Sequence, residues 1–218
     1  MCVQSLIIQV CSLIIQALIA IGTLAVAIIA IWGDWIRSKL LKLSIQSHNL
    51  RGIVTRFTNG PRVIYYHLKI INDRSWMSAK NCRILLRSIY RQGPNREFQP
   101  IQLPVPPQFV WSPAQVTPQL ITLTRSEIID FGRLTEGATQ FEPVLYWYPN
   151  NFQGYIQQNE VVRYCLDIIA EGYTSNRYYV LEVAWNGKWC DNLDEMSQNL
   201  IIREIPENDY TKIIEDSQ

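Results

Sequence analysis

Few side chains in this sequence have the types and spacing that catalysis requires. The two histidines, His48 and His67, lie too far apart along the chain to form a motif. His67 alternates with Tyr66 and Leu68, a pattern that predicts a sheet-surface or hydrogen-bonded core residue rather than a general base. The sequence contains no phosphate-binding glycine loop, nucleophile elbow or metalloprotease motif. We therefore expect no enzyme activity and no cofactor.

Metal binding has equally little support in the sequence. Cys82, Cys165 and Cys190 have no Cys-x-x-Cys spacing, so they are expected to be small buried apolar residues. Their odd number suits a reducing compartment. The acidic segment Trp189–Glu195 has enough carboxylates for a cation, but its spacing matches no known calcium loop. We expect a solvated loop there and no metal site.

One segment, residues 146–155, has a composition suited to recognition. It combines aromatic rings with amides, which would stack on a nucleobase or on a partner's side chain. The alternative is that these rings simply close one end of a folded domain. The candidate recognition residues are Tyr146, Trp147, Tyr148, Asn150, Phe152 and Tyr155.

Three arginines form a second candidate recognition site. Arg83, Arg87 and Arg91 share the parity of one predicted strand, so we expect them to face one side together. They would meet phosphates of lipid headgroups or of a small nucleotide messenger, or they form an ordinary charged sheet face. The net charge of only +1 gives no basic footprint for nucleic acid, so no specific nucleic-acid binding is expected. The partner of this domain would be an unidentified protein or small ligand.

These residues follow a long uncharged N-terminus. No charged side chain precedes Asp34, so all the charges of this 218-residue chain fall after residue 33. The 27 residues from Leu6 to Trp32 would span about 40 Å as a helix, enough to cross a hydrocarbon core of roughly 30 Å. A cleaved signal peptide would have a basic start and a shorter apolar stretch. We therefore predict a retained transmembrane helix over residues 1–36.

The residues flanking this helix predict its orientation. Tryptophan lies favourably at the headgroup level, and Lys and Arg concentrate on the cytoplasmic side. The sequence predicts a single-pass inner or plasma membrane protein, with its N-terminus outside and residues 37–218 in the cytoplasm. The expected interface anchors are Trp32, Trp35, Arg37, Lys39 and Lys42.

Polar side chains within the apolar stretch recur at nearly heptad spacing. They therefore share one face of the helix, where lipid would leave their hydrogen-bonding groups without partners. Another copy of the helix would supply partners, which predicts a homo-oligomeric bundle. Alternatives are a larger ring with the polar face lining a water-filled pore, or chance placement of glutamines near the helix end. The residues are Ser5, Gln9, Ser12, Gln16 and Thr23.

Beyond the helix, alternating apolar residues predict an all-β domain. A basic juxtamembrane linker and first strand are expected over residues 37–47, and a β-sandwich over 48–218. Asn186-Gly187 predicts a type I′ hairpin turn. The proline-rich residues 93–118 predict an extended crossing between sheets, pinned to the core by Phe109 and Trp111. Strands are expected at 41–45, 63–71, 81–90, 120–123, 141–148, 161–170, 178–185 and 199–203.

Two motifs give this domain a family resemblance. A strand ends in Asn72 and an Ala-x-Asn follows at Ala79–Asn81, and further on Gly132-Arg-Leu-Thr-Glu-Gly137 precedes a strand. These features resemble CARDB-type immunoglobulin-like sandwiches. The resemblance implies an antiparallel sandwich used for binding or adhesion rather than catalysis. It also implies that Gly132 and Gly137 make turns and that Leu134 plugs the end of the sandwich.

Two functions fit these expectations. The first is a membrane-anchored, homo-oligomeric scaffold that presents a cytoplasmic β-sandwich as a binding module. The alternative is a membrane-disrupting or pore-forming effector, in which the sandwich senses a ligand and the polar-striped helix acts in the membrane. In architecture this plan resembles membrane effectors of bacterial antiviral systems.

Overall fold

The computed structural model describes residues 2–56, 60–175 and 177–206. Within its first helix, the side chains of residues 2–8, 34, 37 and 38 are not described, so the predictions for Ser5 and Arg37 fall outside the described side chains. The chain divides between Leu40 and Leu41 into two compact units, and each is described by itself.

The first unit is one long helix, α1 (Cys2–Leu40). Its segment Gln9–Gly33 has a mean hydropathy of 2.7 over 25 residues, so it is long and apolar enough to cross a membrane. A signal sequence near an N-terminus meets the same criteria. The helix continues through Leu40, so residues 37–40 are helical rather than part of an extended linker. Lys, Arg and Leu favour helix, which explains this extension past the apolar stretch.

The polar face of α1 is exposed at Gln9, Ser12, Gln16 and Thr23. The Thr23 hydroxyl donates a hydrogen bond of 2.9 Å to the carbonyl oxygen of Ile19. Thr23 is therefore satisfied within its own helix and needs no second copy. The longer side-chain amides of Gln9 and Gln16 make no such bond among the described residues. They are therefore the groups on this face that most need hydrogen-bond partners from another molecule.

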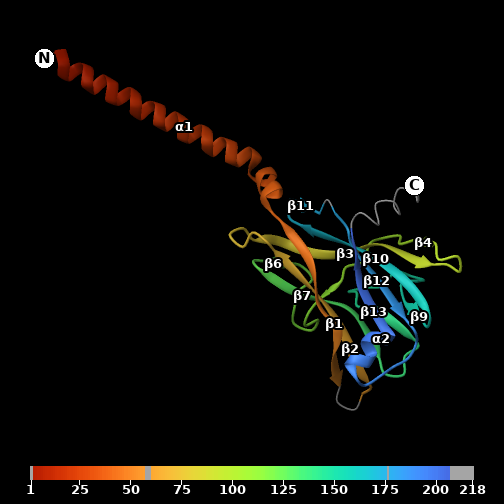
Figure 1. The fold of residues 1–218 in the computed structure, drawn as a ribbon. Helices are drawn as coiled ribbons and strands as arrows, with labels where there is room; N and C mark the ends of the chain where they lie inside the picture. Colours follow the sequence, from red (N-terminus) through yellow and green to blue (C-terminus); the bar gives the residue numbers. More distant parts are fainter. Residues whose placement is uncertain (1, 57–59, 176, 207–218) are drawn as a thin grey trace. The chain divides into compact units, whose positions relative to one another are not determined.

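The second unit is an all-β antiparallel sandwich, as the sequence predicts (Figure 1). Sheet 1 has the order β1 (Leu43–Arg56), β2 (Arg62–Asn72), β7 (Ser126–Thr135), β8 (Gln140–Pro143) and β9 (Ile156–Gln157), with β5 (Val110–Trp111) paired to β7. Sheet 2 has the order β13 (Leu200–Ile205), β12 (Tyr179–Trp185), β10 (Glu160–Ala170), β3 (Ala79–Gln92) and β4 (Phe98–Ile101). In sheet 2, β6 (Ile121–Leu123) pairs with β3 and β11 (Tyr173–Thr174) with β10.

The two ends of this sandwich differ in what they carry. At one end of the sandwich β1 begins and β2 ends, with Leu43 opposite Asn72. We call this the proximal end, because the sandwich begins there in the sequence. The distal end is where β2 begins at Arg62 and β3 ends at Gln92. Between them, alternate side chains of both sheets form one core, with the Phe131 and Tyr164 rings edge to face at 5.7 Å.

The proline-rich segment crosses between the sheets. Its first part forms β4 on sheet 2, and its later part forms β5 on sheet 1. Phe109 and Trp111 are fully buried, which confirms that they pin the crossing to the core. Pro100 lies in β4, which is the edge strand of sheet 2 and so tolerates a residue without an N–H.

The prediction of a turn at Gly132 is wrong. Gly132 lies inside β7, in register with Pro143 of β8. A Cβ there would lie 2.1 Å from Cζ of the buried Phe141, so the position requires glycine for packing rather than for a turn. Gly137, with φ +77°, does lie in the turn after β7. Leu134 is fully buried in the core.

The prediction of a tight hairpin at Asn186-Gly187 is also wrong. The chain instead forms a loop and a short helix, α2 (Leu193–Asn199), before β13 pairs with β12. The Asn192 side chain caps α2 by accepting the backbone N–H of Asp194. Asn186 donates its side-chain amide to that of Asn199 at 2.7 Å, which closes this longer connection.

The two strands that carry the family resemblance form where they are predicted, but they lie in different sheets, so the connection between them is a crossing rather than a hairpin. β2 ends at Asn72 and β3 begins at Ala79, with Asn81 at φ +53°. Membership of the CARDB-type family stays a prediction.

Candidate functional site

An open groove of about 990 Å³ lies at the distal end of sheet 2. It joins two candidate recognition segments, because Arg91 of β3 and Asn150 of the loop after β8 both line it. Its remaining walls are apolar or carry prolines, such as Ile101 and Pro104. Side-chain amides dominate its polar lining: Gln92, Gln99, Gln102, Asn150, Asn151 and Gln153.

Arg91 holds one wall of this groove in place. Its Nη2 donates to the carbonyl oxygens of Gln153 at 2.7 Å and Tyr155 at 2.9 Å. Its Nε lies 3.7 Å from Oε2 of Glu160. The guanidinium is thus committed to the protein's own loop and to a carboxylate, and its main role is to fix that loop.

The three arginines do not share a face, contrary to the prediction. The pairing of β3 with β10 shifts register at Arg87, where Leu86 faces Leu166 and Ser88 faces Cys165. The bulge inverts the alternation of side chains along β3. Before it, even-numbered residues such as Ile84 and Leu86 face the core, and after it the odd-numbered Ile89 does. Arg83 and Arg87 are exposed on the outer side of sheet 2, whereas Arg91 has the parity of the core side.

Arg87 also has a partner. Its Nε lies 3.7 Å from Oδ2 of Asp167, whose side chain is only 2% exposed. Burial raises the pKa of Asp167, and the positive charge of Arg87 partly offsets that rise. The pair neutralises a buried carboxylate on the outer face of sheet 2, which leaves little of this cation for an external phosphate.

The aromatic segment divides into two parts. Tyr148, Phe152 and Tyr155 form one cluster, with ring centroids 5.2–6.0 Å apart. The Tyr148 hydroxyl donates to the carbonyl oxygen of Pro143 at 2.7 Å, and burial raises its pKa. Trp147, by contrast, is 42% exposed. The hydroxyl of Tyr146 is buried away from this cluster, where burial raises its pKa.

The groove-side loop is packed tightly against the core. The hydroxyl of the fully buried Tyr164 donates to the carbonyl oxygen of Gly154 at 2.5 Å, and burial raises its pKa well above the ordinary value. A Cβ at Gly154 would lie 2.2 Å from Cζ of Phe152. The aromatic cluster therefore supports the groove wall from behind, which agrees with the structural alternative for these rings.

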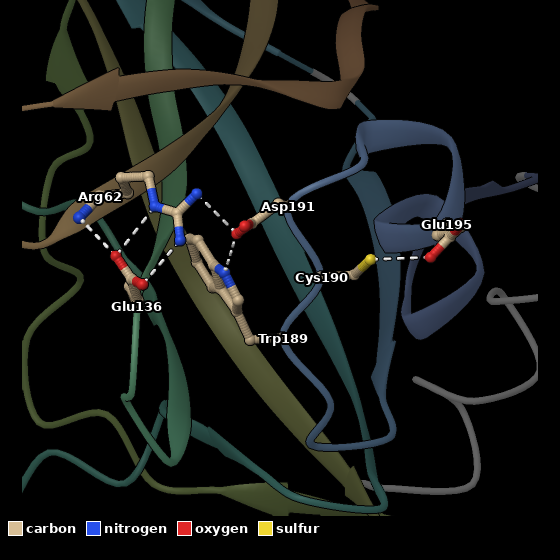
Figure 2. Close-up of polar contacts among 6 residues, drawn as sticks. All are labelled: Arg62, Glu136, Trp189, Cys190, Asp191 and Glu195. Atoms are coloured by element: carbon tan, nitrogen blue, oxygen red, sulfur yellow. Dashed lines mark hydrogen bonds and ion pairs between the residues drawn. The ribbon is translucent and has the colours of Figure 1, made fainter.

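A second polar cluster lies at the distal end near β2 (Figure 2). Arg62 donates through Nε and Nη2 to the two carboxylate oxygens of Glu136, at 3.0 and 2.7 Å. Its Nη1 lies 2.8 Å from Oδ1 of Asp191, which also accepts the indole N–H of Trp189 at 2.9 Å. The carboxylate of the acidic segment thus binds a cation, but the cation is an arginine of the same chain.

These contacts shift the ionisation of the cluster. Hydrogen bonds from Arg62 lower the pKa of Glu136 to about 2, and those carboxylates in turn raise the pKa of Arg62. The hydrogen bond from Trp189, followed by that from Arg62, lowers the pKa of Asp191. Among the described residues, no group of three or more His, Cys, Asp or Glu side chains is placed to hold a metal ion.

Cys82, Cys165 and Cys190 are poor nucleophiles for different reasons. Cys82 and Cys165 are buried as predicted, and burial raises the pKa of Cys82 to about 12. Cys190 is only half-buried, so the prediction is wrong there. Its thiol donates to Oε2 of Glu195 at 2.9 Å, and this contact raises its pKa (Figure 2). A thiol held protonated in this way is a poor nucleophile.

His67 is buried beside a carboxylate on sheet 1. Its Nε2 lies 3.1 Å from Oδ1 of Asp130, and both side chains are about nine-tenths buried. Its ring also lies 6.4 Å from that of Tyr65, nearly parallel to it. The core position agrees with one of the two predicted placements. Among the described residues, however, Nδ1 of His67 and Oδ1 of Asp130 have no hydrogen-bond partner, so the histidine is not the fully hydrogen-bonded core residue that was predicted.

Sequence reasoning missed most of the groove and the Arg62 cluster. Two of the groove glutamines, Gln99 and Gln102, come from the proline-rich segment, whose composition predicts only a crossing between sheets. Arg62 and Asp191 lie far apart along the chain, and no local pattern connects them. The aromatic and amide composition of residues 146–155 was the one usable signal, and it locates one wall of the groove.

Comparison with known proteins adds no assignment. No family model, no curated protein and no solved structure matches this chain.

Proposed function

We propose that this protein is a single-span membrane protein whose β-sandwich is a binding module. The apolar, charge-free segment of α1 supports the membrane span. The basic residues that follow it, Lys39 and Lys42 among them, support an orientation with the sandwich in the cytoplasm. The sandwich then presents its distal groove to cytoplasmic ligands.

The observation that carries the binding proposal is the amide-rich lining of the groove. Each Asn or Gln side chain offers both donors and an acceptor, which match hydroxyl and amide groups of a neutral ligand. Arg91 is the one cation among the described residues that line the groove, and it is engaged within the protein, so the groove lacks the available cations that a phosphate ligand requires. The ligand class that fits is therefore neutral and rich in hydrogen-bonding groups, such as an oligosaccharide.

The experiment compares two chemical sets of ligands by thermal unfolding of the full chain in detergent. Neutral oligosaccharides, such as maltohexaose and chitohexaose, should raise the melting temperature, whereas nucleotides and inorganic phosphate should not. The double variant Gln99→Ala, Gln102→Ala should lose this stabilisation. Gln46→Ala, at an exposed glutamine of β1, is the matched control and should keep it. Stabilisation by the phosphorylated set alone, or by neither set, would refute the proposal.

A homo-oligomer is part of the same proposal. The exposed amides of Gln9 and Gln16 lie one above the other on α1, and partner helices are the simplest source of hydrogen bonds for them in a membrane. The same observation favours a second candidate function, an effector whose assembled helices permeabilise the membrane when the sandwich binds its ligand. Conductance separates the two, because a scaffold bundle leaves the membrane sealed.

A further inference from the structure

An exposed tryptophan stands on the loop between β2 and β3, at the proximal end of the sandwich. Trp76 is 67% exposed, although tryptophan side chains are on average highly buried in folded proteins. Indole combines an apolar body with a polar N–H, which suits the boundary between water and lipid headgroups. The ring therefore has a natural environment that an aqueous surface does not provide.

The loop that carries Trp76 is held by specific bonds. Asn72 is 4% exposed, and its side-chain Nδ2 donates to the carbonyl oxygen of Met77 at 2.5 Å. Its Oδ1 accepts the backbone N–H of Arg74 at 3.0 Å. The backbone N–H of Met77 donates to the carbonyl oxygen of Arg74 at 2.9 Å. Trp76 is thus displayed by a fixed turn, so little ordering entropy opposes its insertion into a surface.

The same loop is attached to the chain immediately after α1. Leu41 is 5% exposed and packs in the core of the sandwich. The backbone N–H of Asp73 donates to the carbonyl oxygen of Lys42 at 3.0 Å. Lys42 is the second residue after Leu40, the last residue of α1, and two residues reach at most about 7 Å. The apolar segment ends at Gly33, seven helical residues or about 10 Å before Leu40, so at most about 17 Å of chain joins the end of a membrane span to Lys42.

The charges around Trp76 fit an anionic lipid surface. Arg125 lies at the same end, because its carbonyl oxygen accepts the backbone N–H of Asn72 at 2.7 Å. Of the acidic side chains at this end, Asp73 lies 3.9 Å from Nζ of Lys42 and Glu171 accepts the amide of Asn81. Three exposed cations make no ion pair with any described residue: Arg74, Lys80 and Arg125. Glu127, near the start of β7, is exposed and makes no ion pair with any described residue, so one unpaired anion stands against three unpaired cations.

We propose that this proximal surface docks on the headgroups of the membrane that α1 spans. Trp76 enters the interfacial region, and Arg74, Lys80 and Arg125 contact lipid phosphates. The proposal rests on the proposed membrane span of α1, and it adds a second contact between protein and bilayer. The short, bonded connection through Leu41 and Lys42 favours lipid over a soluble protein partner, because the bilayer is always within reach of this end.

The test uses the full chain labelled with 5-fluorotryptophan in nanodiscs of phosphatidylcholine and phosphatidylglycerol. A headgroup-chelated gadolinium lipid broadens the ¹⁹F resonance of any tryptophan near the surface. Trp76 should lose its signal, as should Trp35 near the end of α1. Trp189, which belongs to the distal Arg62 cluster, should keep it. The variants Trp35→Phe, Trp76→Phe and Trp189→Phe assign the three resonances.

The outcomes separate this inference from the proposed function. If Trp35 keeps its signal, α1 does not lie in the bilayer, and both proposals fail. If Trp35 loses its signal while Trp76 behaves like Trp189, the membrane span stands and docking of the proximal surface is refuted. Binding of Trp76 to a protein partner would give this second outcome.

A charge variant tests the lipid contact itself. The triple variant Arg74→Gln, Lys80→Gln, Arg125→Gln should reduce the broadening of Trp76 in the anionic nanodiscs. Broadening of Trp35 should not change, since α1 is untouched. An unchanged ¹⁹F shift for Trp189 controls for the fold. Equal broadening of Trp76 with and without the three cations would overturn the proposed contacts to lipid phosphate.

Discussion

At the scale of single residues, the sandwich depends on close approaches that leave no room for added atoms. Gly132 in β7 is the clearest case, because the Phe141 ring occupies the space where its side chain would be. The ring itself is fully buried between Tyr66 and Phe131, with centroid distances of 5.8 and 6.0 Å. Neither neighbour leaves the ring an alternative position.

Gly132→Ala should therefore destabilise the sandwich by about 1–3 kcal/mol, the usual cost of overpacking a core. Urea unfolding of the full chain in detergent measures this change. Gly93→Ala is the control, because a Cβ there would meet its nearest atom at an ordinary 3.7 Å. Adding Phe141→Leu to Gly132→Ala should restore part of the loss. Equal stability of the two alanine variants would contradict the packing argument.

The Arg62–Glu136 pair gives a pH dependence with a definite sign. The folded-state pKa of Glu136 is about 2, below its usual value of 4.5, because Arg62 stabilises the carboxylate. Its contribution to stability is then fully present above pH 4.5 and is lost as pH falls from 4.5 through 2. The effect is modest, since both side chains are about one-third exposed to solvent.

Glu136→Gln should thus lower the melting temperature at pH 7, and the difference from the parent should shrink as pH approaches 2. Thermal unfolding at pH 7, 4 and 2.5 measures this trend. Glu127→Gln replaces an exposed carboxylate of β7 and should show a smaller difference at every pH. A Glu136→Gln difference that stays constant across this range would show that the ion pair does not stabilise the fold.

At the scale of elements, the polar face of α1 gives the most specific prediction, because its amides need hydrogen-bond partners from other helices in a membrane. Replacing Gln9, Ser12 and Gln16 together by Leu removes the hydrogen bonds that partner helices would supply, each worth about 1 kcal/mol in a membrane. We expect the assembly to shift towards monomer, as measured by mass photometry in detergent. Ile14→Leu with Ile21→Leu, off the polar face, should leave the assembly unchanged. A parent protein that is monomeric would refute the oligomer.

Dye release from liposomes separates the two candidate functions in the same variants. An effector should release dye and lose this activity in the triple-Leu variant, while groove binding persists. A scaffold should keep the liposomes sealed with either sequence.

Elements with strong local patterns were predictable from the sequence. The alternation of β2 and the apolar run of α1 give both elements without tertiary information. β7 was missed because Asp130 and Gly132 suggest a turn, and only the ring of Phe141 explains why glycine is needed within the strand. The Asn186-Gly187 turn gave way to α2, since the Asn192 cap and the buried Met196 stabilise a helix there.

The candidate site was predictable only in part. Residues 146–155 gave one wall of the groove, but a single bulge at Arg87 moved Arg91 to the other side of its strand. Strand parity predicts a face only while pairing is regular, and bulges depend on the partner strand. The amides of Gln99 and Gln102 join the site through the pairing of β4 with β3, which local sequence does not encode.

At the scale of the whole molecule, β3 connects two surfaces with different proposed partners. It begins at Ala79, beside the loop that carries Trp76, and ends at Gln92 in the groove. Its 14 residues span about 45 Å at roughly 3.3 Å per residue. Lipid and ligand would therefore bind at opposite ends of one strand without competing for the same side chains.

Pro100 in the edge strand β4 has a further consequence for the proposed assembly of several copies in one membrane. Tethered domains meet at high effective concentration, and exposed sheet edges then tend to pair between neighbours into continuous aggregates. A proline on that edge offers no amide proton to an incoming strand. In the proposed oligomer, Pro100 would therefore hinder the β4 edges of neighbouring copies from pairing with one another.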